Sequence, residues 1–372
     1  MKKVVVGMSG GVDSSVAAFL LKEQGYEVKG VTMQTWEDRE AHGLAIVNDA
    51  KKVAEALGIS HDVINYKDVF IKEVVDYFVS EYMCGRTPNP CTVCNRKVKW
   101  ESLLEYASNV GAELVATGHY AVVSRVNAQI GEICSVEGNL KSLECMSDAE
   151  RYTLKKSVKS LKDQTYALYN LSQEQLSRTL MPIGKYSKDE VRQIAARENI
   201  PVADKPDSQE ICFIPDNDYA GFIERILTSS NLESPKIGNF VTKDGIILGT
   251  HKGITHYTIG QRRGLGLAMG HHIFVTEIRP ETNEVVVGES EDLFKIELKC
   301  NRLNFMGMAD LVSPRKVIAK VRYAHQGEVA MIEMIGDDEI CCIFDNPVRA
   351  VTPGQAVVFY DGDFVLGGGV IL

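Results

Sequence analysis

The feature that most constrains the fold is the start of the chain, where an apolar run leads directly into a loop of small residues. Residues 2–8 read KKVVVGM, and a β-branched run ended by glycine predicts a buried parallel strand. The loop GMSGGVDSS (residues 7–15) follows, and a helix is expected from about Val12 to Gln24. A strand, a glycine-rich loop and a helix in this order are typical of the first βαβ unit of an open parallel sheet.

The alternation of strands and helices continues along the first part of the chain. Further strands are expected at residues 26–33, 60–66 and 112–118, and further helices at 46–57, 69–83, 96–111, 172–180 and 187–200. The last helix begins with Ser187 and Glu190 at capping-box spacing. Residues 127–150 break the rhythm and are interpreted as a β-excursion or insert. The pattern predicts an α/β domain with a doubly wound parallel sheet.

The character of the sequence changes from about Ile237, where short alternating runs replace the helical pattern. Lys243 to Gly245 splits two such runs and predicts a hairpin, and further turn signals recur up to the last residue. We therefore expect three parts, with a catalytic α/β domain over 1–215, a small bridging domain over 216–281, and an all-β barrel or sandwich over 282–372.

Composition limits the cellular setting. No apolar run of the 372 residues approaches the ~20 residues needed to span a bilayer. The apolar run at the start meets glycines and Asp13 too early for a signal peptide, so a cytoplasmic protein with no membrane partner is expected. In that compartment nine cysteines favour free thiols over structural disulfides, and most are expected to be small buried residues. The net charge of −9 argues against nucleic-acid binding by bulk charge, although a local basic face is still allowed.

The loop at residues 7–15 has the composition of an anion site. Gly10 and Gly11 permit a tight turn that brings N–H groups together, and the helix N-terminus adds partial positive charge. It lacks the GK[ST] of a Walker loop and the GxGxxG of a dinucleotide loop. Asp13 is placed to hold Mg²⁺ against a pyrophosphate group. The alternative is an ordinary glycine turn with serine and aspartate caps.

These residues resemble a known family. SGGVDSS (residues 9–15) is similar to the pyrophosphate-binding motif of the ATP pyrophosphatases, which have a fold like that of the adenine nucleotide alpha hydrolases. Further motifs resemble the tRNA-specific 2-thiouridylase family, and the resemblance covers the whole chain. These motifs are GRTPNPCTVCN (85–95), ATGHYA (116–121), LKDQTYAL (161–168), DSQEICFIP (207–215), YTIGQRRGLGL (257–267) and the last 24 residues, 349–372.

The resemblance implies an ATP-dependent sulfurtransferase that places sulfur on carbon 2 of the wobble uridine of tRNA. It also implies a C-terminal β-barrel. The expected ATP-binding residues are Gly7, Met8, Ser9, Gly10, Gly11, Val12, Asp13, Ser14, Met33 and Gly118. Asn89, Pro90 and Cys91 are expected to line the pocket for a flipped uracil, and Lys162, Asp163 and Gln164 match a tRNA-contacting segment. A cysteine desulfurase or a small relay protein would supply the sulfur.

Residue types extend the expected RNA surface. Residues 151–162 carry five cations and no acid, which fits either an RNA-binding face or a solvated charged face. QRRG (261–264) offers further phosphate contacts. Arg322 and Tyr323 offer a cation and a stacking surface, which suit an unpaired base better than duplex RNA.

The pair Cys91 and Cys94 admits several interpretations. Structural zinc needs four ligands, and neither a second Cys-x-x-Cys nor a pair of histidines accompanies this one. A redox pair conflicts with the phosphate loop, whereas two buried thiols remain open. By resemblance, Cys212 carries a persulfide and Cys94 is the partner thiol, which releases sulfide or closes a disulfide with Cys212.

Cys91 departs from many relatives, which have an aspartate there. This opens a second route, in which Cys91, Cys94 and Cys212 hold a [4Fe–4S] cluster with one open iron. Two other classes of protein also remain. One is a small-molecule ATP pyrophosphatase such as an amide-forming ligase, and the other is a non-catalytic RNA-binding or iron–sulfur protein.

Overall fold

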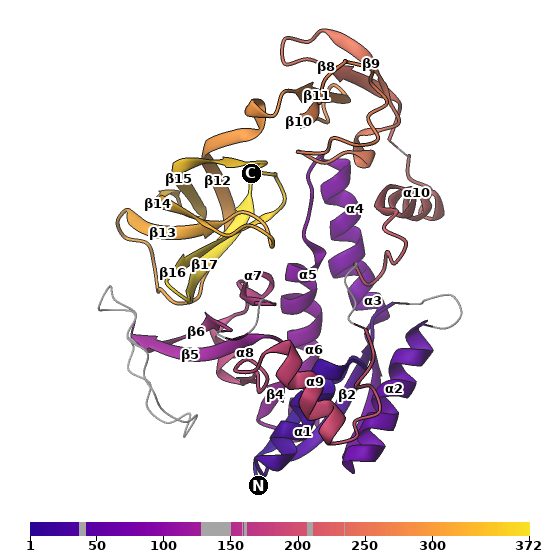
Figure 1. Cartoon of the computed structure of the whole chain (residues 1–372), viewed down its shortest axis with the longest axis vertical. Helices are drawn as coiled ribbons and strands as arrows, with labels where there is room; N and C mark the ends of the chain where they lie inside the picture. Colours follow the sequence, from indigo (N-terminus) through magenta and orange to yellow (C-terminus); the bar gives the residue numbers. More distant parts are fainter. Residues whose placement is uncertain (37–41, 128–149, 158, 160–161, 207–210, 234) are drawn as a thin grey trace.

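The computed structural model describes the chain except residues 37–41, 128–149, 158, 160–161, 207–210 and 234 (Figure 1). A parallel sheet covered by helices is followed by a small four-stranded sheet and by a closed antiparallel barrel. The expected α/β domain, bridging part and C-terminal β-barrel are therefore confirmed. In the part of the chain that the structure describes, no helix is both long enough and apolar enough to cross a membrane.

Five parallel strands form the N-terminal sheet in the order β3-β2-β1-β4-β7. Their bounds are β1 Lys3–Gly7, β2 Glu27–Gln34, β3 Ser60–Asn65, β4 Leu114–Ala116 and β7 Thr179–Leu180. In the central strand β1, Val4 and Val6 pack in the core beneath α1 (Val12–Glu23), α2 (His42–Leu57) and α9 (Lys188–Arg197). Val5 points to the other face and packs with Trp100 and α6 (Glu101–Asn109). Helices cover both faces, so the sheet is doubly wound.

The helix expected over residues 172–180 is wrong at its end. The structure has α8 over Gln173–Ser177, and Thr179 and Leu180 form β7, which pairs with β4. The Thr179 hydroxyl also accepts a hydrogen bond of 2.7 Å from the indole nitrogen of Trp100. Pairing at the sheet edge therefore overrides the local helical pattern. The predicted capping box of α9 is confirmed, because Ser187 and Glu190 each bond to the other's backbone N–H.

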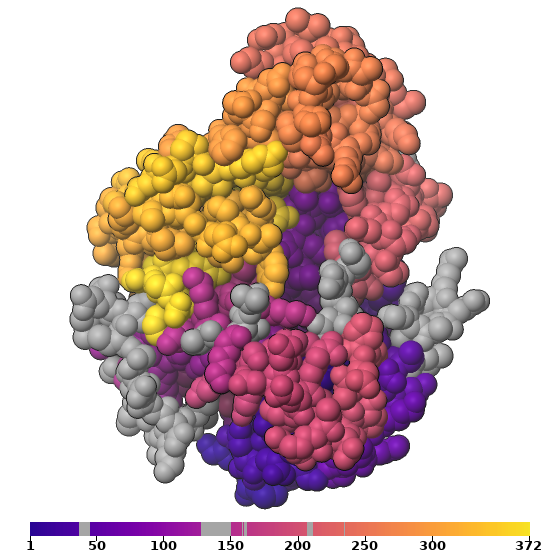
Figure 2. Space-filling model, in the orientation of Figure 1, coloured from indigo at the N-terminus to yellow at the C-terminus, as the bar shows by residue number. Residues whose placement is uncertain are grey.

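Two long helices stand beside this sheet, and the second, called the cysteine helix below, carries Cys91 and Cys94. The first consists of α3 Lys67–Phe70, η1 Ile71–Val75 and α4 Asp76–Met83, and the second of α5 Pro90–Val93, η2 Cys94–Trp100 and α6. Both η1 and η2 are π-helical. Such segments are rare in proteins, and those that occur often lie at functional sites. In Figure 2 the purple surface of these helices is set back between the yellow barrel and the pink-red segment that includes α10 (Tyr219–Ser229).

The middle part is a four-stranded sheet in the order β10-β11-β8-β9. Its strands are β8 Gly238–Val241, β9 Ile247–His251, β10 Phe274–Arg279 and β11 Glu284–Gly288, with a short helix η3 over Ile254–His256. The hairpin expected at Lys243 to Gly245 is confirmed, since β8 and β9 pair antiparallel on either side of it. Because β11 pairs with β10 and β8, the strand pairing favours an end of this part near Gly288 rather than at the predicted residue 281.

The C-terminal part is a barrel of six antiparallel strands. Its elements are η4 Glu291–Leu293, β12 Phe294–Phe305, β13 Arg315–Lys320, β14 Glu328–Gly336, β15 Glu339–Arg349, β16 Ala356–Asp361 and β17 Phe364–Ile371. Pairing of β12 with β17 closes it. Two strands of the first part, β5 Ala121–Asn127 and β6 Glu150–Lys156, pair with each other and extend the sheet at β17. They flank the predicted insert, most of which lies outside the described residues.

Candidate active site

The loop between β1 and α1 leaves the first N–H groups of the helix without a side-chain cap. Gly11 is the N-cap residue of α1 and has no side chain to bond them. Gly10 has φ +64°, and a Cβ atom there would lie 2.6 Å from the Ile46 carbonyl oxygen, so the close turn requires glycine. Uncapped N–H groups at the positive end of a helix suit an anion. The loop therefore has the geometry of a phosphate site.

The side chains of the expected ATP-binding residues differ in their accessibility. Ser9 donates its N–H to the Ser14 hydroxyl over 3.2 Å, which holds the loop closed on itself. Met8 and Val12 are buried, so only their backbone could meet a nucleotide. Met33 is half-buried in β2 and packs against the core beneath α6. The structure thus brings residues 7–14 together, and places Met33 on the neighbouring strand.

Asp13 is already bonded within the protein. Its Oδ1 accepts a hydrogen bond from the Tyr120 hydroxyl at 2.7 Å and an ion pair from Lys188 Nζ at 2.7 Å. Lys188 is the first residue of α9, and the capping box at Ser187 fixes where that helix begins. Both partners therefore bond to the same carboxylate oxygen of Asp13. The predicted Mg²⁺ role of Asp13 stays a prediction.

A second lysine reaches the phosphate loop from the segment after α9. Lys205 Nζ donates to the Gly10 carbonyl oxygen at 3.1 Å and pairs with Asp49 Oδ2 of α2 at 2.7 Å. Neither Lys188 nor Lys205 is predicted from the sequence. The capping box is the signal that could have placed Lys188, because it puts that side chain in the first turn of a helix. No comparable pattern surrounds Lys205.

Gly118 lies against the first turn of α1. A Cβ atom at this position would be 2.5 Å from the Ser14 nitrogen and 2.6 Å from the Asp13 carbonyl carbon, and both are backbone atoms. The absence of a side chain therefore allows the segment after β4 to pack directly on the phosphate loop. This contact gives Gly118 a packing role in the site, whereas the predicted place near adenosine stays a prediction.

The cysteine helix begins with a defined cap. Asn89 is the N-cap residue of α5, and its side-chain oxygen accepts a hydrogen bond from the Cys91 N–H at 3.1 Å. Pro90 occupies the first helical position, which its fixed φ suits. Cys94 is the first residue of the π-helical turn η2. The cap and the proline thus fix the helix start and put Cys94 one turn inside it.

Cys91, Cys94 and Cys212 lie in one neighbourhood but differ in exposure. Cys94 is 7% exposed and packs in a core cluster with aromatic residues that include Phe213, the residue after Cys212. Burial raises the pKa of the Cys94 thiol to about 12, Lys99 opposes this rise, and the Cys212 and Cys91 thiols add to it. Cys91 and Cys212 are exposed. The structure therefore brings together the two predicted sulfur-handling cysteines, which the sequence separates widely.

The alternative of two buried thiols at Cys91 and Cys94 is wrong for one of them. Cys91 is exposed, so the interpretation of a buried pair fails for it. Of the seven cysteines in the described part of the chain, all are free thiols and only Cys94, Cys300 and Cys342 are buried. Cys84 is exposed and Cys341 half-buried, so neither is a plain core residue. Cys134 and Cys145 lie outside the described residues.

A metal site would need at least three ligand side chains grouped together. Among the described residues, which omit 207–210 next to Cys212, no three His, Cys, Asp or Glu side chains are grouped so that they could hold a metal ion. The Nδ1 of His119 lies 2.9 Å from the Thr117 hydroxyl, and desolvation lowers the pKa of this imidazole to about 3.

The loop that precedes the cysteine helix touches all three parts of the protein. The Thr87 N–H donates to the Pro353 carbonyl oxygen at 2.8 Å, and Gln355 Nε2 donates to the Thr87 carbonyl oxygen at 2.8 Å. Both partners lie in the barrel, between β15 and β16. On the other side, a Cβ atom at Gly85 would be 2.8 Å from Ile278 of β10. The start of the cysteine helix is therefore held by the barrel and the four-stranded sheet.

The predicted RNA-contacting residues fall into two groups. Asn89, Pro90 and Cys91 form the start of the cysteine helix, with Pro90 buried. In the other group, Asp163 accepts a hydrogen bond of 2.7 Å from the Thr165 hydroxyl, and its charge raises the pKa of Tyr323 after the larger effect of burial. Residues 162–164 and the barrel turn at 322–323 thus lie near each other.

The barrel turn itself is only partly exposed. Tyr323 has half of its surface exposed and packs edge-on against Tyr166, with ring centroids 6.2 Å apart. The Arg322 guanidinium donates to the Arg349 carbonyl oxygen at 2.8 Å, so it holds the barrel as well. Lys162 lies at the start of the first-domain segment that approaches this turn. Tyr323 is the member of this pair that offers a free ring surface.

The basic stretch at residues 151–162 is largely a structural connection. Arg151 donates to the Phe305 and Met306 carbonyl oxygens of the barrel, and Lys156 lies over the Tyr360 ring at 4.4 Å. Lys159 pairs with Glu190 at 2.9 Å. Arg151 and Lys156 are therefore engaged within the protein, which differs both from an RNA-binding face and from a solvated charged face.

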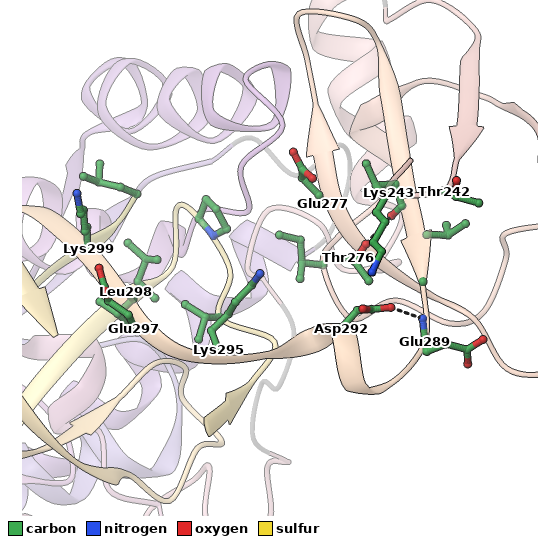
Figure 3. Close-up of a pocket in the computed structure, with 18 of the residues that line it drawn as sticks. Thr242, Lys243, Thr276, Glu277, Glu289, Asp292, Lys295, Glu297, Leu298 and Lys299 are labelled. Atoms are coloured by element: carbon green, nitrogen blue, oxygen red, sulfur yellow. Dashed lines mark hydrogen bonds between the residues drawn. The ribbon is translucent and has the colours of Figure 1, made fainter. Parts of the chain in front are cut away.

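A cavity of about 820 Å³ lies elsewhere, between the four-stranded sheet and the barrel (Figure 3). Lysines and acids from both parts line it, including Lys243, Lys295 and Asp292, and Asp292 accepts a hydrogen bond of 2.8 Å from the Glu289 N–H. Its lining includes none of the residues predicted for ATP, RNA or sulfur. The candidate site is the phosphate loop with the cysteine helix, and not this cavity.

A doubly wound sheet with SGGVDSS after its first strand defines a protein of the ATP pyrophosphatase class. Three domain families match in succession, described as a tRNA methyl transferase HUP domain (residues 2–216), a tRNA methyl transferase PRC-barrel domain (221–289) and an Aminomethyltransferase beta-barrel domain (295–371). The chain is 54% identical to the tRNA-specific 2-thiouridylase MnmA of Lachnoclostridium phytofermentans, with 100% of both chains covered. It belongs to the tRNA-specific 2-thiouridylase family.

Other relatives agree with this membership. The tRNA-specific 2-thiouridylase MnmA of Clostridioides difficile is 48% identical over 100% of this chain and 98% of its own. Among solved structures, the U34-tRNA thiolase NcsA from Methanococcus maripaludis with its [4Fe-4S] cluster is 21% identical over 61% of this chain and 65% of its own, with a TM-score of 0.34. A similarity that low carries no information on the chemistry of the present chain.

Proposed function

We propose that this protein is an ATP-dependent tRNA-uridine 2-sulfurtransferase that acts on the wobble uridine of the anticodon. One structural observation supports it most: Cys94 and Cys212 lie in one neighbourhood, in a protein that also has a phosphate loop of the ATP pyrophosphatase class. The full-length similarity to 2-thiouridylases supports the same activity. A small-molecule ATP pyrophosphatase would need neither the cysteines nor the β-barrel.

The first step adenylates the base. The uracil oxygen on carbon 2 attacks the α-phosphate of ATP, pyrophosphate leaves, and the oxygen becomes part of an AMP leaving group. The N–H groups at residues 10–14 would hold the phosphates, and Lys188 and Lys205 lie close enough to the loop to offset negative charge on pyrophosphate. Mg²⁺ would be held by Asp13 together with phosphate oxygens, and it would neutralise charge on the phosphates.

The second step transfers sulfur. The terminal sulfur of a Cys212 persulfide attacks carbon 2 and AMP leaves with the oxygen, so the base is briefly bonded to Cys212 through two sulfurs. In one route, the Cys94 thiolate then attacks the Cys212 sulfur, which releases 2-thiouridine and leaves a Cys94–Cys212 disulfide for a thiol reductant to reset. In the other, the Cys94 thiolate attacks the Cys212 sulfur of the persulfide before it reaches the base, so that a Cys94–Cys212 disulfide forms and the outer sulfur leaves as hydrosulfide. The hydrosulfide then attacks carbon 2, AMP leaves with the oxygen, and a thiol reductant resets the disulfide. Burial favours the protonated Cys94 thiol here, so both routes require a rearrangement that lets Cys94 lose its proton.

The [4Fe–4S] alternative fits the residues less well. It needs three thiolates in one group, whereas no three side chains that could hold a metal ion are grouped among the described residues. We therefore derive no step through a cluster. Cys91 would instead act as an exposed residue at the start of the cysteine helix, beside the proposed uracil pocket formed with Asn89 and Pro90.

The partners follow from this chemistry. tRNA would contact residues 162–164 and the barrel turn at 322–323, which lie near each other, and its affinity should fall with salt as counterions are released. A cysteine desulfurase or a relay protein would load the persulfide on Cys212, which is an exposed residue although burial raises the pKa of its thiol. A cytoplasmic location fits such partners.

The test is thiolation by iron-free protein. ATP, Mg²⁺, unmodified tRNA and a persulfide-loaded donor are supplied, and 2-thiouridine is measured by mass spectrometry of digested nucleosides. Cys94→Ser and Cys212→Ser are expected to abolish the product and to leave ATP binding intact, whereas Cys84→Ser, an exposed control, should retain activity. Product that appears only after an iron–sulfur cluster is rebuilt would refute the persulfide route. AMP formation without tRNA would favour a small-molecule ligase.

A further inference from the structure

Tyr120 connects two regions that the proposed function assigns to different substrates. Its ring is buried, and its hydroxyl donates to Asp13 Oδ1 of the phosphate loop at 2.7 Å. The same carboxylate oxygen is paired with Lys188 at 2.7 Å. The orientation of the Asp13 carboxylate therefore depends on a tyrosine that is itself no part of the loop.

The backbone of the same residue is bonded to the predicted RNA-contacting segment. The Tyr120 N–H donates to the Gln164 side-chain oxygen at 2.9 Å, and the Gln164 N–H donates to the Tyr120 carbonyl oxygen at 3.0 Å. This two-way contact leaves little freedom between residues 120 and 164. A displacement of Gln164 must move the Tyr120 backbone, because both backbone groups of Tyr120 are held by the same residue.

The segment before Tyr120 has no room to absorb such a displacement. Gly118 packs so closely on α1 that a Cβ atom there would lie 2.5 Å from the Ser14 nitrogen. The tyrosine ring is rigid apart from two side-chain rotations, and burial restricts both. Movement at residues 162–164 is thus passed to the hydroxyl that holds Asp13.

We propose that Tyr120 is a positioning residue that couples RNA contact at residues 162–164 to the ATP loop. The inference rests on the proposed function for the identity of the two ligands. RNA contact at Gln164 sets the place of the Tyr120 hydroxyl, and this fixes the Asp13 carboxylate beside the phosphates. ATP and tRNA therefore bind cooperatively, and ATP is held in its reactive position when the RNA is present.

The coupling is measured directly with α,β-methylene-ATP, which cannot be cleaved between its α and β phosphates. Its Kd is determined by equilibrium dialysis with the full chain, with and without saturating unmodified tRNA. For the natural protein we expect binding to be about fivefold or more tighter with tRNA, the lower end of usual couplings. In Tyr120→Phe the ratio should approach one, while each ligand alone still binds.

Tyr106→Phe is the matched control. Tyr106 donates its hydroxyl to Asp62, which is also paired with Lys29 at 2.9 Å, so the substitution removes the same kind of tyrosine–aspartate–lysine contact. Asp62 lies on the edge strand β3, away from the phosphate loop. This variant should keep the natural ratio. A merely structural role of Tyr120 would change melting temperature without changing the ratio.

Gln164→Leu tests the other end of the path if Tyr120→Phe does not fold. It removes the side-chain oxygen that accepts the Tyr120 N–H, and the ratio is again expected to fall. A natural ratio in either folded variant, or a ratio of one in the natural protein, overturns the inference. Failure of the proposed function would be seen separately, as absence of 2-thiouridine from the natural protein in the thiolation assay.

Discussion

Replacement of Gly118 by alanine is expected to force the segment after β4 away from the phosphate loop. The added Cβ atom would lie 2.5 Å from the Ser14 nitrogen, 2.6 Å from the Asp13 carbonyl carbon and 2.8 Å from the Asp13 carbonyl oxygen. Comfortable contacts begin near ~3.5 Å, so a shift of roughly 1 Å is needed. The three contacting atoms are all backbone atoms at the start of a helix, and no side chain can turn aside to relieve the overlap.

Overpacking of this kind lowers the free energy of unfolding by about 1–3 kcal/mol. For a domain of this size, each kcal/mol lowers the melting temperature by roughly 2–4 °C, so a fall of several degrees is expected. Gly336→Ala is the control, because its Cβ atom would meet only the Glu339 Cβ at 3.6 Å. Both variants are compared by thermal denaturation and by the Kd for α,β-methylene-ATP.

The two measurements separate packing from nucleotide contact at Gly118. A packing role predicts a lower melting temperature without any ligand, together with weaker nucleotide binding because the loop has moved. A direct contact with adenosine alone predicts weaker binding at an unchanged melting temperature. A Gly118→Ala variant as stable as the Gly336→Ala control would refute the reasoning from backbone overlap.

Three further predictions test the surroundings of the site. At pH 8, Cys94 should react with iodoacetamide about a thousandfold more slowly than an ordinary thiol, because a pKa of about 12 leaves little thiolate. Its rate of labelling should rise with pH up to that value. Labelling is measured by mass spectrometry with exposed Cys91 as the reference, and equal labelling of the two cysteines would contradict the prediction. Glu81→Gln should lower the free energy of unfolding by about 1.5–3 kcal/mol, because the buried Glu81 carboxylate pairs with two arginines. Thermal denaturation measures this, and an unchanged melting temperature would show that these ion pairs do not stabilise the fold. Ser187→Ala should lower the free energy of unfolding by about 1 kcal/mol. It should also weaken binding of the ATP analogue, because the cap fixes the start of α9 and with it the position of Lys188. An unaltered affinity for the analogue would show that the cap does not support the nucleotide site.

The sequence was most informative where local chemistry decides the structure. A β-branched run, two glycines and a helix start are local features, and the phosphate loop follows from them. The capping box at Ser187 is local in the same way, and it is confirmed. The helix expected over 172–180 fails where a distant partner decides, because Thr179 and Leu180 pair with β4.

The parts of the site that sequence reasoning missed depend on contacts between distant segments. Lys205 reaches Gly10 only because the chain after α9 returns to the loop, and Tyr120 reaches Asp13 only because β4 lies next to β1. Exposure is a similar case. Cys91 and Cys94 stand three residues apart, yet one is exposed and the other is 7% exposed, since only Cys94 faces the aromatic cluster.

The loop before the cysteine helix shows why three parts are needed to place one thiol. The Thr87 N–H and the Thr87 carbonyl both bond to the segment of the barrel between β15 and β16, at Pro353 and Gln355. Buried Glu81, at the end of α4, pairs with Arg302 of the barrel at 3.6 Å. The barrel also carries the turn proposed to meet the RNA base. The barrel therefore bonds both to the end of α4 and to the loop that leads into the helix that begins at Pro90, so contacts from distant parts of the chain set where Cys94 lies.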